Sequence, residues 1–181
     1  MQPTLTVRFY CSSAGKEPVR EWLKADVSVD ARKAIGADIK TVQFGWPVGM
    51  PVVRKMEADL WEVRSKIPGG IARVLFTNER GIEMKKNPHI GSSFDKFLAE
   101  DGQLNEATAV AVKRVIAWQI EQAMQAAGLN KSTLAKRMHT SRTVVDRILD
   151  SEDTGLTLVP AVSTRDLNRI LFSPGAPRPS P

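Results

Sequence analysis

The spacing of apolar residues changes along this chain, and the change limits the folds open to it. Short runs between Val52 and Phe76 alternate apolar and polar residues, as β-strands do, whereas from about residue 105 apolar residues recur at intervals of three and four, as in helices. Between these regions, Met84–Leu98 begins with polar and basic residues like a free N-terminus and follows Ile71–Thr77 with almost no linker. The pattern predicts two proteins joined at Met84.

The composition is that of a globular protein in a reducing compartment. Apolar residues make up 42% and charged residues 25% of the 181 residues, and no stretch approaches the roughly 20 apolar residues of a membrane-spanning helix. The N-terminus lacks a basic region followed by an apolar one, so we expect a cytoplasmic protein without a membrane partner. One cysteine, Cys11, and two histidines, His89 and His139, predict no disulfide, no metal site and no cofactor.

The charge favours polyanionic partners. A net charge of +6 and a pI near 9.7 point first to nucleic acid, because each cation set against a phosphate releases a counterion. The excess of positive charge is shared equally between residues 1–83 and residues 84–181, so neither part is a polybasic tail. The alternative is a mildly basic protein with no polyanion partner.

The first part predicts a small α+β domain. Its expected elements are a strand at Leu5–Tyr10, helices at Glu17–Lys24 and from Ser28 to about Gln43, a loop at Gly45–Pro51, and an antiparallel meander of Val52–Met56, Leu60–Ser65 and Ile71–Phe76. A sheet that displays Lys55, Arg64 and Arg73 on its open face would hold a phosphate backbone and stabilise charge during phosphoryl transfer. The alternative is that these are ordinary solvated strand positions.

Several segments of this part carry a resemblance. Pro18–Leu23, Gly36–Val42, Gly45–Pro51 and Leu60–Arg64 through Gly70–Phe76 resemble the phage-derived HigB-type toxins of the RelE superfamily. The resemblance implies a small α+β ribonuclease that cuts messenger RNA on the ribosome. It also implies a role for Arg64 and Arg73 in RNA binding or catalysis, with Lys55 as a further candidate.

The chain departs from that pattern after Phe76. Such toxins continue with a final strand, a segment like His-Gly-Phe-x-Lys-Lys and a closing helix, whereas here Asn78–Glu83 leads directly to Met84. RNA cleavage needs proton transfer at the attacking hydroxyl and at the leaving oxygen, and the missing segment would supply those groups. His89 is the only histidine near in sequence. We therefore expect the toxin part to be incomplete and inactive.

The second part predicts an all-helical domain with a helix-turn-helix. A long helix from Asn105 or Glu106 ends at Gly128, and two short helices follow. Asn130 can cap Lys131–Met138, and Thr140 or Ser141 can cap Arg142–Leu149. This arrangement presents the second short helix to a DNA major groove.

The outward positions of these two helices are the candidate DNA-binding residues. Those on the second helix are Ser141, Arg142, Thr143, Asp146 and Arg147, and those expected to contact the DNA backbone are Lys131, Lys136 and Arg137. Arg142 can make a bidentate contact to guanine. The alternative is a plain helical hairpin with a polar outer face.

This part also carries a resemblance. Asn87–Phe94, Lys113–Trp118 and Leu129–Leu149 resemble HigA-type antitoxins with an Xre/Cro-like domain. The resemblance implies binding to operator DNA, formation of a homodimer and neutralisation of a cognate toxin. In operons of this kind the toxin gene comes first, which is the order of the two parts here.

The predicted organisation follows from these observations. Residues 1–83 form a truncated toxin-like domain, residues 84–104 an antitoxin N-terminal segment that acts as a linker, residues 105–172 the helix-turn-helix domain, and residues 173–181 an extended proline-rich tail. A short helix is expected at Ser163–Phe172. The leading hypothesis is a fused toxin-antitoxin protein that binds operator DNA and regulates transcription.

Two other hypotheses stay open. In the first, the protein is a ribosome-dependent messenger RNA endoribonuclease that is restrained in cis by its fused antitoxin part. In the second, the first part is a non-catalytic module that pairs with an intact toxin or antitoxin from elsewhere in the cell.

Overall fold

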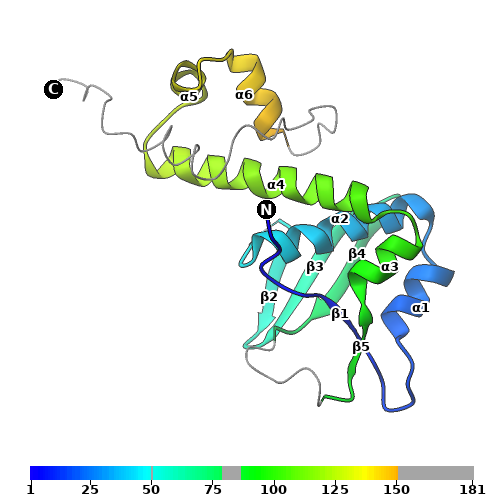
Figure 1. The fold of residues 1–181 in the computed structure, drawn as a ribbon. Coiled ribbons are helices and arrows are strands. Elements are labelled where there is room, and N and C mark those ends of the chain that lie inside the picture. The colour runs from blue at the N-terminus through cyan, green and yellow to red at the C-terminus, as the bar shows by residue number, and fades with distance from the viewer. Residues whose placement is uncertain (50, 79–86, 151–181) are drawn as a thin grey trace. The chain divides into compact units, whose positions relative to one another are not determined.

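The computed structural model of the protein describes residues 1–49, 51–78 and 87–150, which form five strands and six helices (Figure 1). The chain divides into two compact units, Met1–Val112 and Lys113–Pro181. The described part mixes α and β structure around small antiparallel sheets. None of its helices is both long enough and apolar enough to cross a membrane.

The first unit contains the expected meander. Strands β2 (Val53–Glu57), β3 (Leu60–Ile67) and β4 (Gly70–Phe76) form an antiparallel sheet in that order. Val63 lies opposite Val53 on one side and Val74 on the other, so the alternation of the sequence places these valines on one face. The meander prediction is confirmed, with each strand boundary shifted by at most two residues.

Two helices precede the sheet, as predicted. Helix α1 (Pro18–Ala25) has its proline at the first helical position, and helix α2 (Val29–Gly45) begins after Ser28, whose hydroxyl oxygen accepts a hydrogen bond from the Ala31 N–H at 3.3 Å. Helix α2 packs against β3 and buries Ile35, Ile39 and Val42 in a core shared with the sheet. Burial of these side chains removes apolar surface from water and so holds helix and sheet together.

The N-terminal strand pairs with a segment far along the chain. Strand β1 is shorter than expected, Arg8–Tyr10, and it pairs antiparallel with β5 (Ile90–Ser93) rather than with the meander. Helix α3 (Phe94–Glu100) follows β5 directly. Its three apolar side chains are fully buried, with at most 1% of Phe94, Phe97 and Leu98 exposed.

Residues 84–104 therefore differ from the expected linker wherever the structure describes them. Phe94 and Phe97 meet the ring of Phe9 edge to face, at centroid distances of 5.6 and 5.4 Å, which places them in the core of the first unit. Helix α4 (Leu104–Ala126) also begins in this unit and contributes Ala107 to the same core. The boundary between the compact units lies between Val112 and Lys113, not at Met84.

The second unit contains the rest of α4 and two short helices. Gly128 ends the long helix with a φ of 61°, a left-handed conformation that glycine adopts without strain. Helices α5 (Lys131–Arg137) and α6 (Arg142–Leu149) follow at the predicted positions. The buried side chains of their core are Ile120, Met124, Leu134, Ala135 and Val145. The helix expected at residues 163–172 and the tail at 173–181 lie outside the described residues.

Candidate functional sites

The outer face of the three-stranded sheet carries a pair of arginines around one carboxylate. Arg64 on β3 lies directly opposite Arg73 on β4. Two like charges in this register repel each other, but Glu62 lies between them. One oxygen of its carboxylate is 3.6 Å from the Arg64 guanidinium and the other is 3.7 Å from that of Arg73. The structure thus brings two of the three predicted residues together.

Lys55 does not belong to this face, so the expected three-residue cluster is wrong. It lies opposite Trp61, and Trp61 lies opposite Phe76, so the register puts Lys55 on the side of the sheet that carries the apolar core. The outward residue of β2 is instead Arg54, which lies opposite Glu62. Alternation counted from Val53 would have identified Arg54, because neighbouring residues of a strand point to opposite faces.

Glu62 is the residue of this face that the sequence analysis overlooked. Only 4% of its side chain is exposed, whereas 59% of the Arg73 side chain is exposed. The Glu62 Oε2 atom is buried and makes no hydrogen bond. The face can therefore bind an anion through its exposed arginine, Arg73.

Helices α5 and α6 form the second candidate site. The Asn130 side chain accepts a hydrogen bond from the Thr133 N–H at 2.8 Å, and the Ser141 side chain accepts one from the Val144 N–H at 3.3 Å. Both predicted caps are present. Four residues, 138–141, separate the helices, and His139 has a φ of 51° in this turn. The two helix starts are thus fixed by side chains of the chain itself.

The outer surface of α6 carries most of the predicted DNA-binding residues. Ser141, Arg142, Thr143 and Arg147 are exposed, and Val145 is buried beneath them. Val144 is also exposed on this surface, and the sequence analysis did not single it out. An exposed valine methyl can contact the methyl group of thymine in a major groove.

Asp146 on α6 forms an ion pair with a lysine on α5 and with an arginine on its own helix. Its carboxylate is 2.8 Å from the Lys131 ammonium and 3.7 Å from the Arg142 guanidinium. The hydrogen bond from Lys131 lowers the pKa of Asp146, a small desolvation effect opposes this, and the charges of Lys131 and Arg142 lower it further. Lys131 is therefore paired within the protein, whereas Lys136 is exposed at the end of α5.

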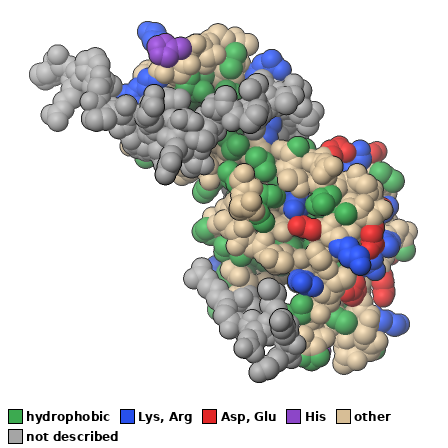
Figure 2. Space-filling view, viewed as in Figure 1, with side chains coloured by type: hydrophobic (Ala, Val, Ile, Leu, Met, Phe, Trp, Pro, Cys, Tyr) green, Lys and Arg blue, Asp and Glu red, His purple; other side chains and the backbone are tan. Residues whose placement is uncertain are grey.

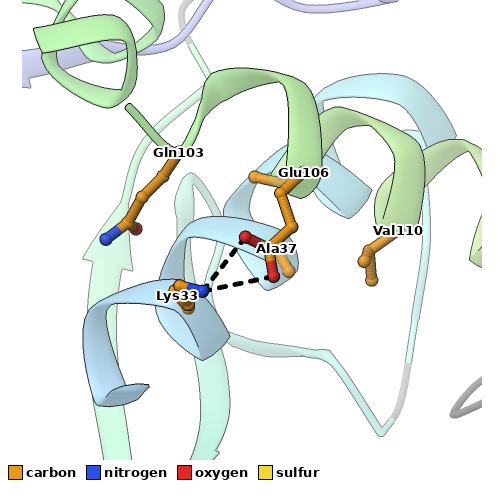
Figure 3. Close-up of a pocket in the computed structure, with 6 residues that line it drawn as sticks. Lys33, Ala37, Gln103, Glu106 and Val110 are labelled. Carbon is orange, nitrogen blue, oxygen red and sulfur yellow. Dashed lines mark hydrogen bonds and ion pairs between the residues drawn. The ribbon is translucent and has the colours of Figure 1, made fainter. Parts of the chain in front are cut away.

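A small hollow lies between α2 and the start of α4 in the first unit (Figure 3). Lys33 and Glu106 face each other across it, with the ammonium 3.1 Å from one carboxylate oxygen. Its other lining residues are Ala37, Gln103, Ala107 and Val110. The hollow contains none of the predicted site residues. No group of three His, Cys, Asp or Glu side chains within the described ranges is placed to hold a metal ion.

Comparison with protein families finds a similarity over a stretch of the first unit. Residues 21–83 match the family described as Phage derived protein Gp49-like (DUF891). The match begins within α1 and includes α2 and the strands β2, β3 and β4. Comparisons with curated proteins and with solved structures gave no match.

Proposed function

We propose that this chain is a toxin-antitoxin-related protein whose second unit binds operator DNA and regulates transcription. The Gp49-like match at residues 21–83 supports a toxin-like origin for the first part. The resemblance of residues 87–149 to HigA-type antitoxins supports the DNA-binding role. In this proposal α5 and α6 are the helix-turn-helix, and a homodimer binds the two halves of an operator.

The arrangement of α6 is the observation that carries the proposal. The helix begins after Ser141, whose side chain caps it, and it buries Val145. Arg142, Thr143 and Val144 are exposed. The Arg142 side chain is 69% exposed, so its guanidinium can reach the two acceptor atoms of a guanine. A surface helix with an arginine, a hydroxyl and a methyl-bearing residue at its N-terminal end has the groups that direct base recognition uses.

The test is a binding titration with the DNA upstream of the encoding gene. Arg142→Ala should weaken binding by about 1–3 kcal/mol and relax the base preference at one position. Arg54→Ala, which removes the same charge from the first unit, is the matched control and should leave the affinity unchanged. Equal affinity of the unmodified protein for this DNA and for random DNA of the same length contradicts the proposal.

A second candidate function is RNA cleavage by the first unit, and the opposed pair Arg64 and Arg73 is the observation that favours it. The Arg73 side chain is 59% exposed and can bind a phosphate and stabilise charge during phosphoryl transfer, and Glu62 holds the two guanidiniums beside each other. The full chain would be added to a translating extract and message cleavage mapped. Arg73→Ala should abolish cleavage and Lys66→Ala, an exposed change on the neighbouring strand, should not. Because this candidate is restrained in cis, it is refuted only if the message is cleaved neither by the intact chain nor by a chain that has been cut between residues 83 and 84 and diluted until its pieces separate.

A further inference from the structure

Oppositely charged residues join the two predicted parts of the chain. We call residues 1–78 the body and residues 87–106, which form β5, α3 and the start of α4, the acidic segment. Five ion pairs among the described residues join the two, and each of these has its cation in the body and its anion in the acidic segment. The pairs are Arg20 with Glu100 (2.9 Å), Lys24 with Glu100 (3.7 Å), Arg32 with Asp101 (2.9 Å), Lys33 with Glu106 (3.1 Å) and Lys40 with Asp95 (3.0 Å).

In two of these pairs the cation is largely removed from water. Only 3% of the Lys40 side chain is exposed, and Asp95 also accepts a hydrogen bond from the Gln43 amide at 3.4 Å. Arg32 is 13% exposed and its guanidinium contacts Asp101. A buried cation without its carboxylate is strongly unfavourable, so the body depends on an acidic partner at this place. On the visible face, basic and acidic side chains lie side by side over the region of α1 and α3 (Figure 2).

Backbone contacts add a defined register. The Cys11 N–H donates to the His89 carbonyl at 2.8 Å, and the His89 ring Nδ1 lies 2.9 Å from the Cys11 carbonyl oxygen. A carbonyl only accepts, so this Nδ1 carries the proton. The ring also stacks on Tyr10 at a centroid distance of 5.7 Å. These contacts fix the acidic segment along β1 in one alignment.

The contact is too close for an arbitrary strand to fit. Glu17 of the body accepts hydrogen bonds from the N–H and the hydroxyl of Ser92. A methyl group on Gly91 would clash with the Glu17 carboxylate and lie 2.9 Å from the Phe9 carbonyl oxygen. The fit therefore requires a glycine, then a serine, then a helix with acidic residues and an apolar face.

We propose that the flank of the body formed by β1, α1 and α2 is a docking surface for the acidic strand–helix segment of an antitoxin-like protein, and that this chain supplies the segment in cis. The inference rests on the toxin-antitoxin relation proposed above, but not on DNA binding. The cis segment occupies the surface, so a separately encoded antitoxin of this kind is excluded from it. A body released from its own segment accepts one in trans.

The test separates body and segment after they have folded together. A protease recognition sequence is inserted between residues 83 and 84 of the full chain, the chain is cut, and the two pieces are followed by size-exclusion chromatography. They should elute together at micromolar concentration. Arg32→Glu or Asp101→Arg alone should weaken the association by about tenfold or more, and the two combined should restore it. Lys66→Glu, outside the interface, is the control.

Two results overturn the inference. One is that the cut pieces of the unmodified chain elute separately, and the other is that the double reversal binds no better than the weaker single variant. A second measurement uses the uncut chain and needs no substitution in the interface. Nitrogen-15 NMR of the two histidines, assigned with His139→Gln, should show His89 protonated at Nδ1. Protonation at Nε2 in the neutral ring contradicts the docked arrangement. Neither measurement involves DNA, so each is independent of the operator-binding test.

Discussion

Replacement of Phe97 by alanine tests whether residues beyond Met84 are part of the first core. The side chain is 1% exposed and its ring meets Phe9 at 5.4 Å and Phe94 at 6.0 Å. Truncation of a buried phenylalanine costs about 3–5 kcal/mol, and the loss of two ring contacts favours the upper end of that range. We expect Phe97→Ala to lower the free energy of unfolding of the entire first unit by this amount.

The assay is urea unfolding followed by tryptophan fluorescence. A Trp118→Phe background removes the tryptophan at residue 118 and leaves Trp22, Trp46 and Trp61, all in the first unit, as reporters. With a urea slope on the order of 1–3 kcal/mol per molar, the midpoint should fall by about 2 M. If Phe97→Ala is too unstable to study, Phe97→Leu should lower stability by about 1 kcal/mol.

The control and the refuting result use the same measurement. Leu75→Ala truncates a side chain that is 58% exposed, so the free energy of unfolding should change by no more than about 0.5 kcal/mol. If Phe97→Ala behaves like Leu75→Ala, residues 90–100 do not contribute to the first core and the linker hypothesis is correct.

Three further outcomes are expected. Gly91→Ala should lower the stability of the first unit by about 1–3 kcal/mol, because the added methyl group clashes with Glu17. In the control Gly49→Ala the added methyl group meets open space, so stability should not fall. Equal melting temperatures of the two variants would contradict this prediction. Burial raises the pKa of Glu17, but its hydrogen bonds and a neighbouring arginine outweigh burial and leave the pKa lowered. The stability that this carboxylate contributes is therefore complete above the ordinary glutamate pKa of about 4.5 and is lost as the pH falls through the lowered pKa. The difference in melting temperature between the unmodified protein and Glu17→Gln should therefore shrink as the pH falls below the lowered pKa. Asp146→Asn should release Lys131 and steepen the salt dependence of DNA binding by about one unit of slope; an unchanged slope in titrations at several salt concentrations would argue against the role assigned to this pair.

Most helices and the meander could be predicted because their signals are local. Asn130 and Ser141 each precede a run with helical spacing and cap their helices as expected, and Ser28, where the second helix is predicted to begin, is the cap of α2. The meander strands alternate and are separated by turn-sized gaps, so their pairing follows from chain connectivity.

The pairing of β1 with β5 could not be predicted in the same way. Ile90–Ser93 contains a glycine and two serines, which have little preference for strands, and its partner lies far away in sequence. The helix behind it did leave a signal, because Phe94, Phe97 and Leu98 are spaced as one apolar helix face. A segment with such a face needs a core to cover it and is a poor candidate for a linker.

The candidate sites also combine features that local sequence predicts with contacts that depend on the folded structure. The positions of Arg64 and Arg73 on one face follow from alternation, but their direct opposition depends on the register set by the turn between β3 and β4. The carboxylate of Glu62 between them, and the capture of Lys131 by Asp146, arise from side chains that meet only in the folded protein. Such charge pairs determine which residues are available to a ligand, and sequence spacing does not show them.

The pairing of β1 with β5 also dictates when this protein can fold during its synthesis. Arg8 and Gly91, which are in contact across the two strands, are 83 residues apart in the chain. At a translation rate of about 5–20 residues per second, β5 is synthesised about 4–16 s after β1. During that interval Phe9 has none of the rings that later surround it. The body is thus completed only after the segment that covers its flank has been synthesised, and one ribosome delivers both in fixed order and equal amount.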